Sequence, residues 1–261
     1  MLAILVCSGC QDMTWGGRSY APVDPHQARV DARTVLLQCV HNNNPLTRMH
    51  AIEAVARTMG AKEGRLLLQG LNDPVVSVRF AAAMAVGDVG YRPAIPRLQE
   101  IVSNPNSDQR VVGAAIYALH KMGDYRYTGQ LAILLHSELD EGRATAATVM
   151  GKIGEDSAIG PLKSLLADET TPAVRLAIVE ALARLGDKRS RQMLESYAKQ
   201  YFLDLRLAVI PTIGELRVQG AFRILRTLMR NTKNPPRVRV SAAGALGAMG
   251  IYEKAGEKLA Q

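Results

Sequence analysis

The sequence predicts an all-α fold, a right-handed α-solenoid of about seven helix-turn-helix repeats. A 13-residue phrase recurs as VRFAAAMAVGDVG at 78–90, VRLAIVEALARLG at 174–186 and VRVSAAGALGAMG at 238–250. Such a fixed period is typical of stacked repeats. The 261 residues are 48% hydrophobic but only 5% aromatic. A thin two-layer stack can be filled with Ala, Leu, Ile and Val, whereas a wide core needs more Phe and Trp.

Seven copies of the phrase align on their closing residue, with steps of 30, 33, 31, 32, 31 and 33 residues. About 31 residues accommodate two short antiparallel helices and two tight connections. The first helix often opens at Asn or Asp followed by Pro, a pattern that caps a helix N-terminus. The closing glycine is expected to be a left-handed C-cap. The closing residues are Gly60, Gly90, Gly123, Gly154, Gly186, Arg217 and Gly250.

Each helix of a repeat has one apolar face. In the fifth copy, helical spacing places Ala177, Ile178, Ala181, Leu182 and Leu185 on the same side of the first helix. The second helix, for example AIGPLKSLLA at 158–167, has a similar stripe. Neither helix can bury its stripe alone, so consecutive pairs must stack around a continuous core. We expect the second helices to form most of the concave surface.

The chain divides into a signal-like segment (1–10), a tether (11–24) and a repeat domain (25–261). Within the domain, 25–43 holds a capping helix, Pro25 to His41, and 44–261 holds the seven repeats. Cys39 is expected to be buried against the first repeat as a small hydrophobic residue. In copy six Pro211 should kink the first helix, and a polar helix after Gly250 should cap the stack. The apolar face of the capping helix contains Ala28, Ala32, Val35, Leu36, Cys39 and Val40.

The phrase V-R-x-x-A-x-x-A-L-x-x-x-G and the Asx-Pro opening resemble HEAT-like repeats, especially the short bacterial type described around bilin lyases. The resemblance covers residues 44–261. It implies the solenoid fold and says almost nothing about function.

An arginine recurs 11 residues before the closing residue in five copies. One interpretation is a structural ladder, in which each guanidinium binds helix-end carbonyls or an Asp of the neighbouring repeat. The other is a row of cations presented to a ligand. The ladder consists of Arg79, Arg143, Arg175, Arg206 and Arg239.

A basic segment lies between Leu216 and Arg239, where seven basic residues and no acidic ones occur. The net charge of the chain is +8, which permits an anionic partner. The segment is interpreted either as a binding patch for acidic protein, lipid headgroups or nucleic acid, or as a solvated face with arginines near helix C-termini. Nucleic acid is the least favoured ligand because interleaved aromatic residues are lacking. The candidate binding residues are Arg223, Arg226, Arg230, Lys233 and Arg237.

The N-terminus, MLAILVCSGC, resembles the end of a bacterial lipoprotein signal, with small residues Ser8 and Gly9 before Cys10. The run is too short to span a bilayer, which takes about 20 residues. The resemblance implies lipidation at Cys10 and a membrane-anchored protein on the periplasmic side of the cell envelope. The alternative is an unprocessed N-terminal segment of a cytoplasmic protein.

No catalytic constellation, metal site or cofactor site is predicted. HEAT-like folds include a metal-dependent hydroxylase that uses His-Glu pairs, but the five histidines here precede Gln27, Asn42, Ala51, Lys121 and Ser137. Three cysteines are too few for a disulfide framework. The leading hypothesis is a scaffold that binds another protein on its concave face, and an acidic surface on that partner would suit the net charge of the chain. The alternatives are a bilin-lyase-like enzyme or subunit and a cytoplasmic nucleic-acid-binding protein.

Overall fold

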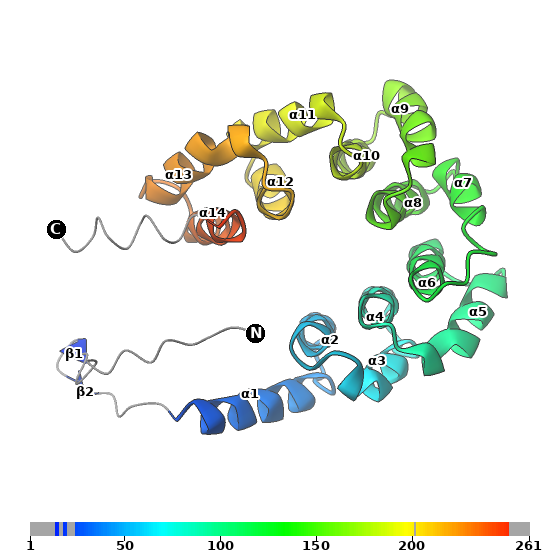
Figure 1. Cartoon of the computed structure of the whole chain (residues 1–261), viewed down its shortest axis with the longest axis horizontal. Coiled ribbons are helices and arrows are strands. Elements are labelled where there is room, and N and C mark those ends of the chain that lie inside the picture. The colour runs from blue at the N-terminus through cyan, green and yellow to red at the C-terminus, as the bar shows by residue number, and fades with distance from the viewer. Residues whose placement is uncertain (1–13, 16–17, 20–23, 201, 251–261) are drawn as a thin grey trace.

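The computed structural model describes residues 14–15, 18–19, 24–200 and 202–250, and Figure 1 shows their helices in two concentric curved rows. Within the predicted tether, β1 (Thr14–Trp15) pairs antiparallel with β2 (Arg18–Ser19). The predicted signal segment with Cys10, and the polar helix predicted after Gly250, lie outside the described residues. Among the described residues, no helix is long and apolar enough to cross a membrane.

The inner row is made by the first helix of each repeat. Six glycines close repeats with positive φ, between 62° and 90°. Gly90 and Gly154 have the predicted left-handed conformation, whereas Gly60, with a ψ of −147°, does not. Arg217 takes the place of glycine in copy six with a φ of 49°, and the helix before it continues through Pro211. The inner helices are α2 (Pro45–Met59), α4 (Val76–Val89), α6 (Gln109–Lys121), α8 (Asp140–Ile153), α10 (Pro172–Arg184), α12 (Leu203–Glu215) and α14 (Pro236–Ala248).

The outer row holds the second helices. They are α3 (Gly64–Gly70), α5 (Ile95–Ser103), α7 (Gln130–Leu135), α9 (Ile159–Asp168), α11 (Lys188–Lys199) and α13 (Phe222–Arg230), preceded by α1 (Pro25–Cys39). Short 3-10 turns precede four of them: η1 (Gly60–Glu63), η2 (Arg92–Ala94), η3 (Asp156–Ala158) and η4 (Gln219–Ala221). The described residues therefore contain six complete helix pairs and the first helix of a seventh.

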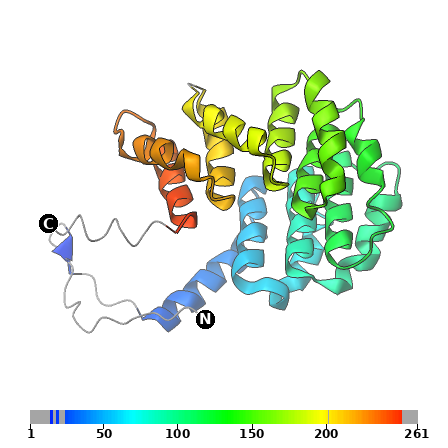
Figure 2. The ribbon, with the colours of Figure 1, turned by 45° about the horizontal axis from the view of Figure 1, so that its top comes forward.

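The concave side of the arc is lined by the inner row, not by the second helices as the sequence suggested (Figures 1 and 2). The reason is residue size. A Cβ built on Gly87 would lie 2.7 Å from the Cα of Ala118, and one on Gly214 would lie 2.6 Å from the Cα of Ala245. The outer helices bury larger residues such as Leu98. Small residues let inner helices approach more closely than outer ones, so the stack bends toward the inner row.

The starts of the inner helices vary. Asn44 caps α2 by accepting a hydrogen bond from the Leu46 N–H, as its sequence predicts. Asp73 instead accepts from the Val75 N–H in the turn ahead of α4, and the side chain of Asn234 donates to the carbonyl of Leu228. Only the first of these three Asx-Pro pairs is therefore a helix cap.

Helix α1 extends the outer row at its N-terminal end. It has no fully buried residue, although Leu36 and Val40 pack on the first core cluster. Val35, expected on the buried face, is 55% exposed, and Cys39 is half-buried, not buried. Helix α1 therefore covers the first repeat mainly through Leu36 and Val40, and the predicted burial of Val35 and Cys39 is wrong.

Candidate functional site

The concave surface carries a row of charged residues. The residue two before each closing residue is Asp88, Lys121, Lys152, Arg184 and Glu215 in copies two to six. Because these positions share one register, they follow one another across α4, α6, α8, α10 and α12. Tyr117 and Glu180 precede Lys121 and Arg184 by four residues and lie on the same helix face. We call these seven residues the concave strip.

Helix geometry directs the concave strip away from the outer row. In α10, Leu182 packs in the same cluster as Leu162 of the outer helix α9. Successive residues of an α-helix are about 100° apart. Glu180 and Arg184, each two residues from Leu182, therefore lie on the opposite side of α10, which faces the concave surface.

The N-terminal half of the concave strip is organised by Tyr117. This side chain is only 4% exposed, and its hydroxyl donates to Asp88 Oδ1 at 2.5 Å. The ammonium group of Lys152 lies 5.7 Å from the centre of the Tyr117 ring. Burial, and then the bond to Asp88, raise the pKa of Tyr117, so its hydroxyl stays protonated at neutral pH. The tyrosine thus links α4, α6 and α8.

The C-terminal half joins α10 to α12 by polar contacts. Arg184 forms a bidentate ion pair with Glu215, with N–O distances of 2.5 and 2.7 Å. The hydroxyl of Thr212 donates to Glu180 Oε1 at 2.7 Å. Burial raises the pKa of Glu180, whereas the hydrogen bonds from Arg184 lower the pKa of Glu215. These contacts hold Glu180, Arg184 and Glu215 in place through side chains. Helices α4 and α6, in contrast, meet through the close backbone contact of Gly87 with Ala118.

The concave strip presents charges of both signs, and hydrogen bonds or ion pairs hold Asp88, Arg184 and Glu215 in place. Lys121 and Lys152 are exposed, and neither forms an ion pair within the described part of the chain. No group of three or more His, Cys, Asp or Glu in the described residues could hold a metal ion. This arrangement suits recognition of a polar surface. Sequence reasoning missed it, although the charged position two before each closing residue was visible in five consecutive copies.

The predicted basic residues separate in the structure. Arg223, Arg226 and Arg230 lie on the exposed face of α13 and line an open depression of about 690 Å³ with Thr227 and Asn231. Lys233 follows in the connection to α14, and Arg237 lies in the first turn of α14. The first three therefore belong to the outer row, whereas Arg237 belongs to the inner row.

The recurring arginines make intramolecular contacts. Arg79 donates to the carbonyls of Asp73 and Pro74 at 2.7 and 2.9 Å. Arg143 binds the carbonyl of Ser137 at 2.8 Å and the carboxylate of Glu169 at 2.7 Å. The remaining contacts are Arg175 to the carbonyls of Leu166 and Glu169, Arg206 to the Asn234 side chain, and Arg239 to the carbonyl of Met229.

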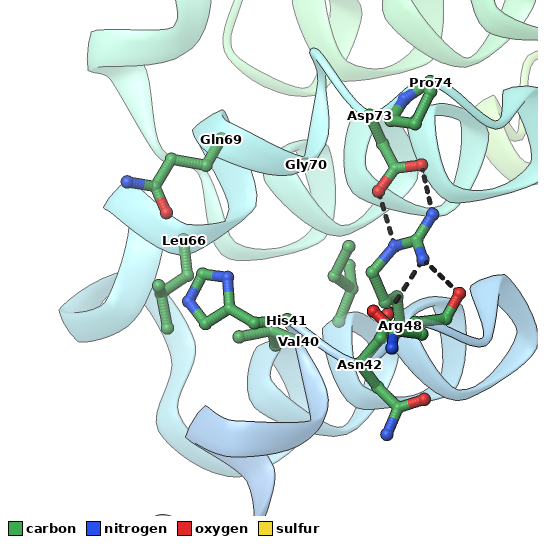
Figure 3. Close-up of a pocket in the computed structure, with 11 residues that line it drawn as sticks. Val40, His41, Asn42, Arg48, Leu66, Gln69, Gly70, Asp73 and Pro74 are labelled. Carbon is green, nitrogen blue, oxygen red and sulfur yellow. Dashed lines mark hydrogen bonds and ion pairs between the residues drawn. The ribbon is translucent and has the colours of Figure 1, made fainter.

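A separate cleft of about 350 Å³ is lined by the turn that follows α1, by helices α2 and α3, and by the turn that precedes α4 (Figure 3). Arg48 crosses one wall, binding both carboxylate oxygens of Asp73 at 2.7 and 2.8 Å. It also donates to the carbonyls of Asn42 and Asn43. The bond from Arg48 lowers the pKa of Asp73. The Arg48 guanidinium therefore connects the turn between α1 and α2 to the turn that contains Asp73.

Comparisons with known proteins agree with this architecture. A family model for HEAT repeats matches residues 64–136 and 128–202. The chain is 24% identical over 245 residues to deoxyhypusine hydroxylase-B of Oryza sativa subsp. japonica, covering 79% of this chain and 78% of that protein.

Two solved structures are also similar. The complex of CpcE and CpcF of phycocyanin lyase from Nostoc sp. aligns with a TM-score of 0.50 at 17% identity, over 83% of this chain and 94% of that one. Human deoxyhypusine hydroxylase aligns with a TM-score of 0.43 at 20% identity, over 87% and 88%. At 17% identity, the likeness to the CpcE and CpcF complex shows the fold alone.

Proposed function

The chain belongs to the HEAT repeat family, and on that premise we propose that it is a non-enzymatic scaffold that holds another protein against its concave surface. The observation that carries the proposal is the concave strip, whose charged side chains are held in register across five inner helices. Solenoids use such extended concave surfaces for binding. The paired side chains of Arg184 and Glu215 are already held in place, so they lose little conformational entropy when a partner binds.

The exposed ammonium groups of Lys121 and Lys152 lie at the centre of the concave strip and favour a partner with an acidic segment. A photo-crosslinking residue placed at Lys121 in the native host should give one discrete adduct. Lys152→Glu in the same background should abolish it, since charge reversal repels an acidic segment. Lys62→Glu, on an exposed outer turn, is the matched control. Equal crosslinking in both charge variants would contradict concave binding.

The predicted lipid at Cys10 supplies the second part of the proposal, a scaffold anchored at the cell envelope. The support is the apolar run followed by Ser8, Gly9 and Cys10. Intact-mass and N-terminal analysis of the protein from its native host tests this directly. A chain beginning at acylated Cys10 supports the anchor, and a soluble chain that retains Met1 rejects it.

The likeness to deoxyhypusine hydroxylase raises an enzyme as a second candidate. Metal analysis and a hydroxylase assay of the purified protein test this candidate. Stoichiometric metal whose removal abolishes hydroxylase activity would favour the enzyme. A copurifying chromophore would instead favour a bilin-lyase-like role, and salt-sensitive binding to duplex DNA would favour the nucleic-acid role.

A further inference from the structure

The outer row is unevenly charged. Its last two described helices, α11 and α13, carry seven basic residues and one acidic residue. The five preceding outer helices, α1, α3, α5, α7 and α9, together carry five basic and three acidic residues. The positive charge of the outer surface is therefore concentrated at the C-terminal end of the arc, where Figure 1 shows α11 and α13 in succession.

Six of these basic side chains are exposed on two helices that contact each other, and we call them the outer basic face. Helices α11 and α13 contact each other, and the carboxylate of Glu195 on α11 lies against Gly220, just before α13. No ion pair of these six occurs among the described residues. The outer basic face consists of Lys188, Arg189, Lys199, Arg223, Arg226 and Arg230.

We propose that the outer basic face binds the surface of a bilayer that carries anionic phospholipid. Clusters of four to eight Lys and Arg on a helical surface are typical of binding to anionic lipid. The face lies on the convex side of the arc (Figure 2), so a flat membrane can reach it without hindrance from neighbouring helices. The depression along Arg223, Arg226 and Arg230 offers Thr227 and Asn231 as additional hydrogen-bonding groups for headgroup phosphates.

Two features favour lipid over the other anionic ligands. Among the described residues, no exposed large hydrophobic side chain lies on α11 or α13. Single-stranded nucleic acid would need exposed aromatic rings for stacking. The outer basic face, unlike the concave strip, also presents charge of one sign only, which suits a continuous anionic plane of headgroups. This inference does not depend on the concave partner or on lipidation.

Vesicle sedimentation of the full chain with Cys10→Ala tests the proposal without any contribution from an acyl group. We expect binding to phosphatidylcholine vesicles that contain phosphatidylglycerol, no binding to pure phosphatidylcholine, and release in 0.5 M salt because the charges are screened. The triple variant Arg223→Gln, Arg226→Gln and Arg230→Gln should bind roughly 100-fold more weakly, given the contribution of each cation near an anionic surface.

A control variant with the same change of charge sits at the other end of the outer row: Arg29→Gln, Lys62→Gln and Arg65→Gln, all exposed positions. It should bind like the parent, and both triple variants should keep the thermal unfolding midpoint of the parent. Equal loss of binding in the two triple variants would overturn the proposal, because net charge would then be the cause. Absence of binding to anionic vesicles by the parent would also overturn it, even if the parent bound an acidic protein or DNA.

Discussion

Gly87 of α4 lies against the backbone of α6 so closely that an added Cβ would stand 2.7 Å from the Cα of Ala118. Real Cβ atoms do not approach a backbone this closely, so the two helices depend on the absence of a side chain. The same contact recurs between Gly151 and Ala181. These close contacts explain why the inner row has the smaller radius of curvature.

We expect Gly87→Ala to destabilise the protein, although alanine is the better helix former. The new methyl group must push α4 away from α6, a form of overpacking that costs about 1–3 kcal/mol. Gly160→Ala is the control, because Gly160 is exposed and has nothing within 4 Å of the added Cβ. The control should be neutral or more stable by up to about 1 kcal/mol. Urea unfolding of both variants measures this, and a stabilised Gly87→Ala would disprove the close contact.

The recurring arginines are expected to act on stability. Arg175 donates to the carbonyls of Leu166 and Glu169 at 3.0 and 2.6 Å. Arg175→Ala leaves these acceptors without that donor, so we expect a loss of about 1–3 kcal/mol. Arg65→Ala, at an exposed position on α3, should change stability by less than about 0.5 kcal/mol. Thermal unfolding of the two variants measures the difference. Equal unfolding midpoints would favour the alternative interpretation, in which the recurring arginines are presented to a ligand.

Acid should weaken the contact between copies four and five. Glu169 is 7% exposed, and the hydrogen bonds from Arg143 lower its pKa to about 2. A lowered pKa means that the carboxylate stabilises the folded state above the unfolded pKa near 4.5, and that this stabilisation is lost as pH falls toward 2. Glu169→Gln should therefore lose less stability between pH 5 and pH 2 than the parent.

The control for the acid series is Glu138→Gln, at an exposed position in the same repeat. Its free energy of unfolding should follow that of the parent at each pH. A Glu169→Gln curve that also runs parallel to the parent would show that the Arg143 pair contributes nothing to the acid sensitivity.

Removing the charge of Glu180 should stabilise the protein at neutral pH, whereas the charge of Glu169 is expected to be stabilising there. Burial raises its pKa, so its ionised form costs stability, and that cost appears as pH rises through the unfolded and then the folded pKa. Glu180→Gln keeps an acceptor for the Thr212 hydroxyl and removes the charge. The variant should be more stable than the parent at pH 7.5, with the gain reduced at pH 4. Chemical unfolding at pH 7.5 and pH 4 measures the free energy of unfolding of the variant and the parent. An equal gain in stability at the two pH values would show that the charge of Glu180 is not the cause.

The repeat architecture could be predicted from the sequence because its signals are local. A glycine with positive φ and an apolar stripe both act within a single repeat. The concave side could not be assigned this way, since it depends on how closely residues such as Gly87 and Ala118 approach across two repeats. The pairing of Arg184 with Glu215 was equally inaccessible, because 31 residues separate them and their alignment depends on the stacking of α10 and α12.

At the positions two before each closing residue, the signs in the concave strip run negative, positive, positive, positive, negative from Asp88 through Lys121, Lys152 and Arg184 to Glu215, and Glu180 adds a carboxylate four residues before Arg184. Adjacent packed helices are typically 8–10 Å apart, so a partner with the complementary order would match all five positions in only one alignment. Displacing it by one repeat would bring like charges together at two of the four remaining positions. The charge order would thereby fix the position of the partner along the arc, in addition to favouring its binding.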